Sequence, residues 1–246
     1  GLTNDEYNYS LKAHFDFAIE PKGQPVAFAV EFDEEYHITD QKARRNDNLK
    51  NLICEKLGLP LLRVEIDKLK QVGKYSILGW LIELWFLYNH FLDAQRRGDV
   101  PLDEPFDYQS IFASSTDDKV EYFPYDPFRN YRTLLTNLCR SNEAMACSVL
   151  AVETLEGNIE AIAIIFLNNN KAILGRAKCK SFLFPPITPG ELAEELSTKD
   201  VFSNYWKYRE GTYKTVTHTE ANELLKKFKS NSQVLSGWQM NHNPHF

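Results

Sequence analysis

Two acidic residues on neighbouring predicted strands are the first indication of chemistry in this chain. Asp16 lies in the alternating residues 14–19, and Glu31 directly follows the apolar residues 26–30. A Pro- and Gly-containing turn separates the two segments, so we expect an antiparallel hairpin that brings the carboxylates together. Carboxylate oxygens are preferred ligands of Mg²⁺, which activates water and offsets charge on a phosphodiester. The pair therefore predicts a metal site suited to phosphodiester hydrolysis.

A third acid, Asp33, extends this pair. It follows Glu31 by two residues, and the period of a strand places both on one face. Asp16 stands between Phe15 and Phe17, where a buried carboxylate would be costly without a cation or another partner. The simpler interpretation is that these acids are solvated at strand ends. Our working expectation is a metal site in which Asp33 assists directly or through water.

Three basic residues could move the proton or stabilise the charge of the transition state. His37 follows the second strand, and histidine titrates near neutral pH, which suits general acid or base work. Lys50 lies on a predicted helix and could project back to the strands. A solvated Lys50 paired with Asp47 or Glu55 explains the same residue equally well. Lys42, in the first turn of that helix, is the third choice.

Basic residues outside this group could contact a nucleic acid. Two of them occupy the predicted helix near the acids, and three others alternate along one face of a later strand, where they form a basic stripe. A solvated helix face and a solvated sheet face account for the same residues. The predicted nucleic-acid contacts, with Lys42 included, are Lys42, Arg44, Arg45, Arg176, Lys178 and Lys180.

The first half of the chain is expected to hold the acids on a mixed sheet. A helix between the second and third strands makes those two strands parallel neighbours. Gly58 stands where a left-handed cap would end that helix. Arg63, in the third strand, is expected to pair with a carboxylate in a structural role. The predicted strands are residues 7–19, 26–33 and 59–66, and the predicted helices are residues 41–57 and 75–97.

The second half has the pattern of a separate, smaller α+β region. A helix is followed by three strands joined by short turns and then by further helices. The predicted helices are residues 128–140, 190–197, about 200–209 and 219–229, and the predicted strands are residues 147–155, 159–167 and 171–184. The expected domains are a core at 1–98, a linker or irregular connection at 99–127, an α+β domain of unknown role at 128–230 and a mobile tail at 231–246.

The acidic hairpin and the elements that follow it resemble the PD-(D/E)XK nuclease superfamily. The branch around the very-short-patch-repair endonucleases and related bacterial domains is the most similar. The resemblance covers about residues 5–67, a quarter of the chain. The residues that carry it are Asp16, Phe17, Val30, Glu31, Asp33, His37, Arg45, Asp47, Lys50, Gly58 and Arg63.

This resemblance implies an α/β fold, in which a restriction-endonuclease-like mixed sheet flanked by helices precedes the smaller α+β region. It implies that Mg²⁺ or Mn²⁺ is bound by Asp16, Glu31 and the main-chain carbonyl of Phe32, and that the substrate is DNA. Asp33 stands where the superfamily usually has a lysine. The role of that lysine would then pass to His37 or Lys50.

Two other functions fit the same sequence. A module that keeps the nuclease fold without turnover could bind nucleic acid or a protein partner, and the replaced lysine favours it. Alternatively, the second half could determine the function by binding a protein partner. A superfamily acid on the preceding helix could be supplied here only by Glu6. No pattern in the sequence predicts an oligomeric state.

Composition limits the class of protein. With 246 residues, 43% of them hydrophobic, the chain can bury a large core. The net charge of −6 excludes a surface that is basic throughout, but it permits a local basic groove. No apolar run reaches the roughly 20 residues of a membrane span, and no leader peptide is recognisable, so a cytoplasmic location without a membrane is expected. The cysteines have no metal-binding spacing and are expected as buried thiols: Cys54, Cys139, Cys147 and Cys179.

Overall fold

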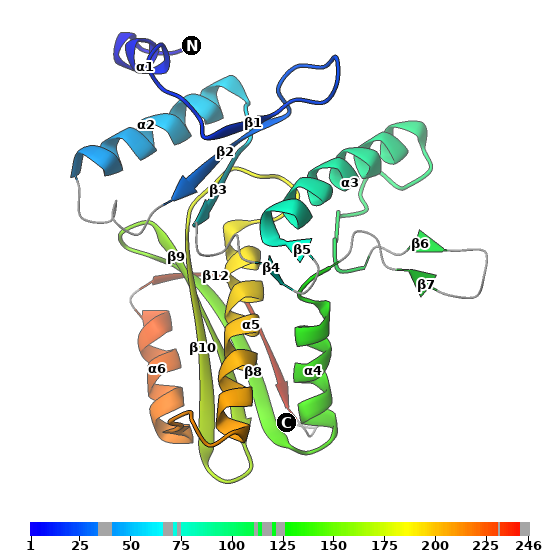
Figure 1. Ribbon diagram of the computed structural model, residues 1–246, viewed down its shortest axis with the longest axis vertical. Coiled ribbons are helices and arrows are strands. Elements are labelled where there is room, and N and C mark those ends of the chain that lie inside the picture. The colour runs from blue at the N-terminus through cyan, green and yellow to red at the C-terminus, as the bar shows by residue number, and fades with distance from the viewer. Residues whose placement is uncertain are drawn as a thin grey trace. The chain divides into compact units, whose positions relative to one another are not determined.

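The computed structural model divides into two compact units, each of which is described by itself. Unit 1 comprises residues 1–127 and 182–188, and unit 2 comprises residues 128–181 and 189–246. The structure describes residues 1–33, 41–65, 71–72, 75–110, 113–114, 120–121, 126–230 and 232–241. Within these residues both units combine helices with sheets, so the expected mixed α/β class is confirmed (Figure 1).

Unit 1 contains a small sheet that positions the acidic residues. Strands β1 and β2 pair antiparallel, and β2 and β3 pair parallel across the intervening helix α2. Both pairings confirm the expected hairpin and the expected strand–helix–strand connection. The order of the sheet is β1-β2-β3 (Figure 1). The elements are α1 (Asn4–Ser10), β1 (Phe17–Ile19), β2 (Phe28–Asp33), α2 (Gln41–Leu57) and β3 (Leu61–Glu65).

The beginning of the chain differs from the expected strand at residues 7–19. A helix, α1, occupies Asn4–Ser10, and only Phe17–Ile19 are extended as a strand. Thr3 and Glu6 explain the difference, because they form a capping box. The Thr3 hydroxyl accepts a hydrogen bond from the Glu6 amide, and the Glu6 carboxylate accepts one from the Thr3 amide. Such a box satisfies main-chain donors at the first turn and favours a helix over the apolar alternation.

The helix α3 (Ile77–Arg97) supplies much of the core of unit 1. The Ser76 hydroxyl caps its N-terminus, and Gly98 ends it with a φ of 81°. Trp80, Leu81 and Leu84 are fully buried along its first turns. Two short two-stranded sheets complete the unit: β4 (Gln71–Val72) with β5 (Tyr75–Ser76), and β6 (Ala113–Ser114) with β7 (Val120–Glu121).

Residues 182–188 belong to unit 1 although they lie between two elements of unit 2 in the sequence. Leu183 forms an antiparallel bridge with Leu61 of β3, with N···O distances of 2.8 and 3.1 Å. The Phe184 ring contacts the rings of Phe28 and Trp85, with centroids 5.2 and 5.7 Å away. This segment therefore extends the sheet beyond β3 and completes an aromatic cluster.

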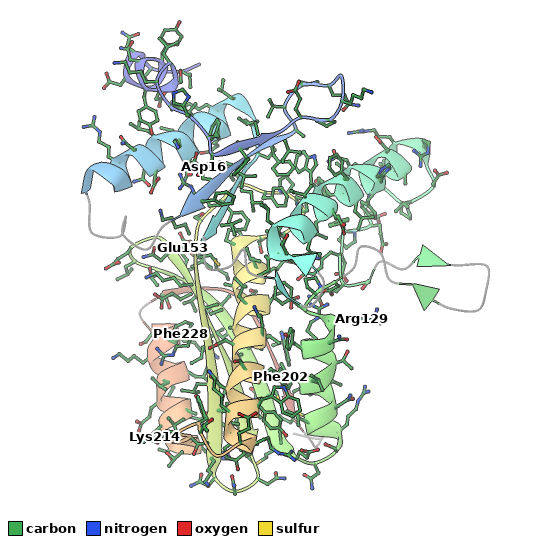
Figure 2. All side chains as sticks on the ribbon, in the orientation of Figure 1. Asp16, Arg129, Glu153, Phe202, Lys214 and Phe228 are labelled. Carbon is green, nitrogen blue, oxygen red and sulfur yellow. The ribbon has the colours of Figure 1, made fainter. Side chains whose placement is uncertain are left out.

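Unit 2 is a five-stranded antiparallel sheet with helices on both faces (Figure 1). Its order is β11-β10-β9-β8-β12. Figure 2 labels Phe202 of α5 and Phe228 of α6, which pack into the cores on opposite faces of the sheet. The elements are α4 (Arg129–Arg140), β8 (Ala144–Thr154), β9 (Asn158–Leu167), β10 (Lys171–Lys180), α5 (Pro189–Arg209), β11 (Val216–Thr217), α6 (His218–Ser230) and β12 (Ser232–Asn241).

Two predictions for unit 2 were wrong. Residues 190–197 and 200–209 were expected as separate helices, but α5 runs unbroken from Pro189 to Arg209. The expected mobile tail contains the ten-residue strand β12, which pairs antiparallel with β8 and has a register shift between Val234 and Ser236. Trp238 and Met240 of β12 pack against the core on the face of α4 and α5, which explains why this segment is ordered. Among the described residues, no helix is both long and apolar enough to cross a membrane.

Candidate functional site

Glu31 is a buried acid of unit 1. It lies on β2, the central strand of the small sheet, and only 7% of its surface is exposed. Its Oε2 atom lies 2.6 Å from Nζ of Lys50. Its Oε1 atom is buried and has no hydrogen-bond partner among the described residues. A buried carboxylate oxygen without a donor costs free energy, so this atom is suited to receive a cation or a donor from a ligand.

Lys50 is the basic residue that reaches this acid. From α2 its ammonium contacts Glu31 and also donates to the main-chain carbonyl of His14 at 2.8 Å. The same ammonium lies 5.7 Å from the centre of the Phe15 ring. Its side chain is 15% exposed. Lys50 therefore joins α2 to β2 and to the segment that leads into β1.

Asp16, which Figure 2 labels, directly precedes β1. Phe17 pairs with Val30, so continuing the antiparallel register by one residue places Asp16 opposite Glu31. Asp16 Oδ2 accepts a hydrogen bond from the Phe32 amide at 2.8 Å. Asp16 and Phe17 are both exposed, so the argument that flanking phenylalanines bury this carboxylate was wrong. The hairpin nevertheless places both acids at the same point of the sheet.

Arg63 of β3 fixes the helix that carries Lys50. It is 2% exposed, its Nε donates to Asn51 Oδ1 at 2.9 Å, and its Nη1 lies 3.2 Å from Asp47 Oδ1. The expected pairing of Arg63 with a carboxylate is confirmed. Asp47, Lys50 and Asn51 are three and four residues apart and share one face of α2. The spacing of these polar residues is the signal in the sequence that could have shown that this face of the helix is directed towards the strands.

The helix α1 also packs near this group. Its Glu6 pairs with Lys56 of α2 at 2.6 Å, and this contact and the Thr3 amide lower the pKa of Glu6. The Tyr9 hydroxyl donates to the Asn46 carbonyl at 3.3 Å. Burial raises the pKa of Tyr9, and the charges of Asp47 and Glu31 raise it further. Sequence reasoning missed Tyr9 because it expected this segment to be a strand.

The structure describes the remaining predicted residues of unit 1 only in part. Asp33 ends β2, where its main chain pairs with that of Glu65, and Phe32 pairs with Val64. Arg45 is exposed on α2. His37 and the side chains of Asp33, Lys42 and Arg44 lie outside the described residues. Within the described part of the chain, no group of three or more His, Cys, Asp or Glu side chains is arranged to hold a metal ion.

The basic stripe of Arg176, Lys178 and Lys180 lies on β10 in unit 2. Arg176 is exposed, and the other two residues are half-buried. Lys178 lies 3.4 Å from Glu160 on the neighbouring strand β9. This ion pair partly neutralises the stripe. The stripe thus belongs to unit 2, whereas the acids belong to unit 1.

Comparison with known proteins adds one match. Residues 6–76 match the model of a family described as a protein of unknown function, DUF2726. No curated protein matches the chain, and no solved structure matches it. The matched segment runs from α1 to β5 and thus contains every element that carries the group around Glu31.

Proposed function

We propose that unit 1 is a metal-dependent nuclease that hydrolyses DNA phosphodiester bonds. The observation that carries the proposal is the buried Glu31 carboxylate, whose Oε1 has no hydrogen-bond partner among the described residues. Its Oε2 contacts Lys50, and extending the strand register by one residue from Phe17 and Val30 places Asp16 opposite Glu31. An acid pair beside a lysine is the arrangement implied by the resemblance to the PD-(D/E)XK nucleases. A restriction-endonuclease-like arrangement of the core is part of this proposal.

The oxygen atoms at and around Glu31 are ligands suited to Mg²⁺ or Mn²⁺. Both ions favour carboxylate oxygens, and Glu31 Oε1 is buried without a competing donor among the described residues. Asp16 and the Phe32 carbonyl would supply the other protein ligands. A bound cation would offer Lewis-acid stabilisation of the phosphodiester and a more acidic water. Glu31 and Asp16 would hold that cation on the sheet beside the scissile bond.

Lys50 would perform the task of the lysine that Asp33 replaces. Its ammonium lies at the acid pair, held by the His14 carbonyl and by Glu31. An ammonium group that is already held in place before the reaction can stabilise the negative charge that develops on the phosphate oxygens, because the protein needs little reorganisation during the reaction. Arg63 maintains the orientation of Lys50 by binding Asp47 and Asn51 on the same helix face. His37 is the alternative for proton transfer, and it lies outside the described residues.

The substrate would approach along the first part of α2. Arg45 is exposed there, one turn or more before Lys50, and Lys42 and Arg44 precede it in the same helix. Exposed arginine and lysine bind phosphates without reading sequence, and thus set the register of the strand. These contacts would add affinity to a protein whose net charge is −6.

The second candidate function is nucleic-acid binding without turnover. Two observations favour it: Lys50 already neutralises Glu31, and Asp16 already accepts a hydrogen bond from the Phe32 amide. Both acids thus have partners within the protein. Asp33 also replaces the usual lysine of the superfamily. Cleavage and binding must therefore be measured side by side.

The test is cleavage of plasmid and single-stranded DNA with Mg²⁺ or Mn²⁺ by the full chain and its variants. Glu31→Gln and Asp16→Asn should each lower the rate by about 100-fold or more, because each removes a charged ligand. Glu20→Gln is the matched control, since Glu20 is exposed just after β1, and it should cleave normally. Cleavage that persists in both site variants would overturn the proposal. DNA binding without cleavage under either metal would establish the second function.

A further inference from the structure

Two cysteines of unit 2 lie in direct contact. Cys139 is in the last turn of α4, Cys147 is on β8, and their Sγ atoms are 3.3 Å apart. Both residues are almost completely buried, at 1% and 0% exposure. Both are thiols in the structure. A disulfide bond requires about 2.05 Å between the sulfurs, so a shift of little more than 1 Å would permit one.

The surroundings hold the two sulfurs side by side. Cys139 Sγ lies 3.8 Å from the Met240 carbonyl of β12, and Cys147 Sγ lies 3.8 Å from the Leu135 carbonyl of α4. Both side chains belong to the core that α4 and α5 form with the sheet. Cys179, by contrast, contacts the Pro189 carbonyl at 3.7 Å, and Cys54 lies in unit 1. The pair is therefore distinguished by geometry from the other two cysteines.

The contact also makes the two thiols unequal. The hydrogen bond between the two thiols lowers the pKa of Cys139, and burial opposes this effect. The same hydrogen bond and burial raise the pKa of Cys147. Because the thiolate is the nucleophile, this inequality favours Cys139 as the sulfur that reacts with an oxidant and Cys147 as the one that resolves the product.

We propose that Cys139 and Cys147 form a thiol–disulfide pair that is oxidised by hydrogen peroxide. The Cys139 thiolate attacks one peroxide oxygen, the O–O bond breaks, and hydroxide leaves and takes up a proton to form water. The Cys139 sulfenic acid is then attacked by the Cys147 sulfur. The S–S bond forms, the S–O bond breaks, and the hydroxyl leaves as water with the Cys147 proton. Two thiols are oxidised and one peroxide is reduced to two waters.

A local opening of β12 would bring peroxide to this buried pair. This strand is the last in the sheet order and pairs with β8 alone among the described strands. Met240, which pairs with Cys147, is one residue before the end of β12. Ends of edge strands open locally at low cost compared with global unfolding. Such an opening would expose the sulfurs to a reactant about the size of water.

The disulfide would fasten the end of α4 to β8 across the short connection at residues 141–143. A crosslink restricts the unfolded chain and so stabilises the unit that contains it. The inference does not rest on the proposed nuclease activity, because it concerns a core in unit 2. Oxidation of the two thiols would therefore increase the stability of unit 2.

The test uses the reduced full chain treated with hydrogen peroxide, alkylated under denaturing conditions and digested with trypsin. Arg140 lies between the two cysteines, so trypsin separates them into the peptides 133–140 and 141–171. The expected product is one crosslinked peptide pair that disappears on reduction, while Cys54 and Cys179 remain alkylated. The melting temperature of the oxidised chain should be several degrees above that of the reduced chain.

Matched variants separate this pairing from general oxidation. Cys147→Ser should abolish both the crosslinked peptide and the rise in melting temperature, whereas Cys54→Ser should keep both. The wild-type digest answers the question even if Cys147→Ser fails to fold. Full alkylation of Cys139 and Cys147 after peroxide treatment would overturn the proposal. Crosslinks distributed at random among the four cysteines, or sulfinic acid in place of the disulfide, would also overturn it.

Discussion

At the scale of single residues, the candidate site consists of charges that are held in pairs. Glu31 is buried, and its cationic partner, Lys50, comes from a helix that Arg63 anchors. Removing one partner of a buried pair leaves the other charge uncompensated, which usually costs more than replacing both. Single and double substitutions at these positions can therefore distinguish an effect on stability from an effect on activity.

Lys50→Met should lower the free energy of unfolding by about 3 kcal/mol, because it leaves the Glu31 carboxylate buried without its cation. The double variant Lys50→Met with Glu31→Gln should recover most of that stability and still cleave no DNA. Urea unfolding of the single and double variants measures the coupling. Lys12→Met, at an exposed position, is the control and should change neither property. A Lys50→Met protein as stable as the wild type would contradict the buried pairing.

Glu194 of α5 gives a prediction of pH dependence. Burial raises the pKa of its carboxyl above the ordinary 4.5, nearby Glu195 and Glu191 add to the rise, and Ser236 offsets part of it. Its Oε1 is buried without a hydrogen-bond partner among the described residues. Because the pKa of Glu194 is raised in the folded state, the contribution of this carboxyl to the free energy of unfolding is most favourable below pH 4.5. That contribution is lost as the pH rises through the folded-state pKa.

Glu194→Gln removes the charge that burial disfavours. It should therefore raise the melting temperature by a few degrees at pH 7, and the gain should vanish at about pH 4, where the wild-type carboxyl is protonated. Melting curves across this range measure the effect. Glu223→Gln, exposed on α6, should have the same melting temperature as the wild type throughout. A gain that grows as the pH falls would contradict the explanation.

At the scale of elements, close packing of α5 on the sheet depends on one glycine. A Cβ atom at Gly175 of β10 would lie 2.2 Å from the Val201 nitrogen and 2.5 Å from the Ser197 carbonyl oxygen of α5. These contacts are with main chain, so no side-chain rotation can relieve them. Gly175 therefore sets how closely α5 approaches β10.

Gly175→Ala should destabilise unit 2 by about 3 kcal/mol, because α5 must move away from the sheet and its apolar contacts loosen. The free energy of unfolding in urea is the measurement. Gly190→Ala is the control: its Cβ would lie 3.4 Å or more from neighbouring atoms, and alanine suits a helix better than glycine. The explanation fails if the two variants are equally stable.

Elements defined by neighbouring residues could be predicted from the sequence, and those defined by distant contacts could not. The β1–β2 hairpin and the β2–α2–β3 connection follow from local turn and cap signals. The strand β12 was missed because it is ordered by pairing with β8, whose residues lie 78 to 95 positions earlier in the chain. Lys50 was one of three residues predicted for one role, and only the fold of α2 onto β2 shows which described lysine contacts Glu31.

At the scale of the whole molecule, the division into units does not follow the order of the sequence. Unit 1 uses residues 182–188, which lie between β10 and α5 of unit 2 in the chain. The family match at residues 6–76 contains the group around Glu31 but not this segment. The stability of unit 1 thus depends on residues far from the matched region.

Phe184→Ala should destabilise unit 1 by about 3 kcal/mol, because a buried ring between Phe28 and Trp85 is replaced by a cavity. Tryptophan fluorescence during urea unfolding is a direct measurement, since Trp85 stacks on this ring. Phe86→Ala on α3, where the ring is 39% exposed, should have a much smaller effect. Equal losses in the two variants would show that Phe184 adds nothing beyond an ordinary surface ring.

The position of residues 182–188 also determines the order in which the units can be completed during translation. A ribosome releases residues 1–127 first, yet Leu183 and Phe184, which pair with β3 and fill the aromatic cluster, emerge only after β8, β9 and β10. The nascent unit 1 must therefore wait for three strands of unit 2 before its last contacts form. Unit 2 in turn is completed by β12, at the very end of the described chain. Synthesis of the two units is thus interleaved, with neither finished before the other has begun.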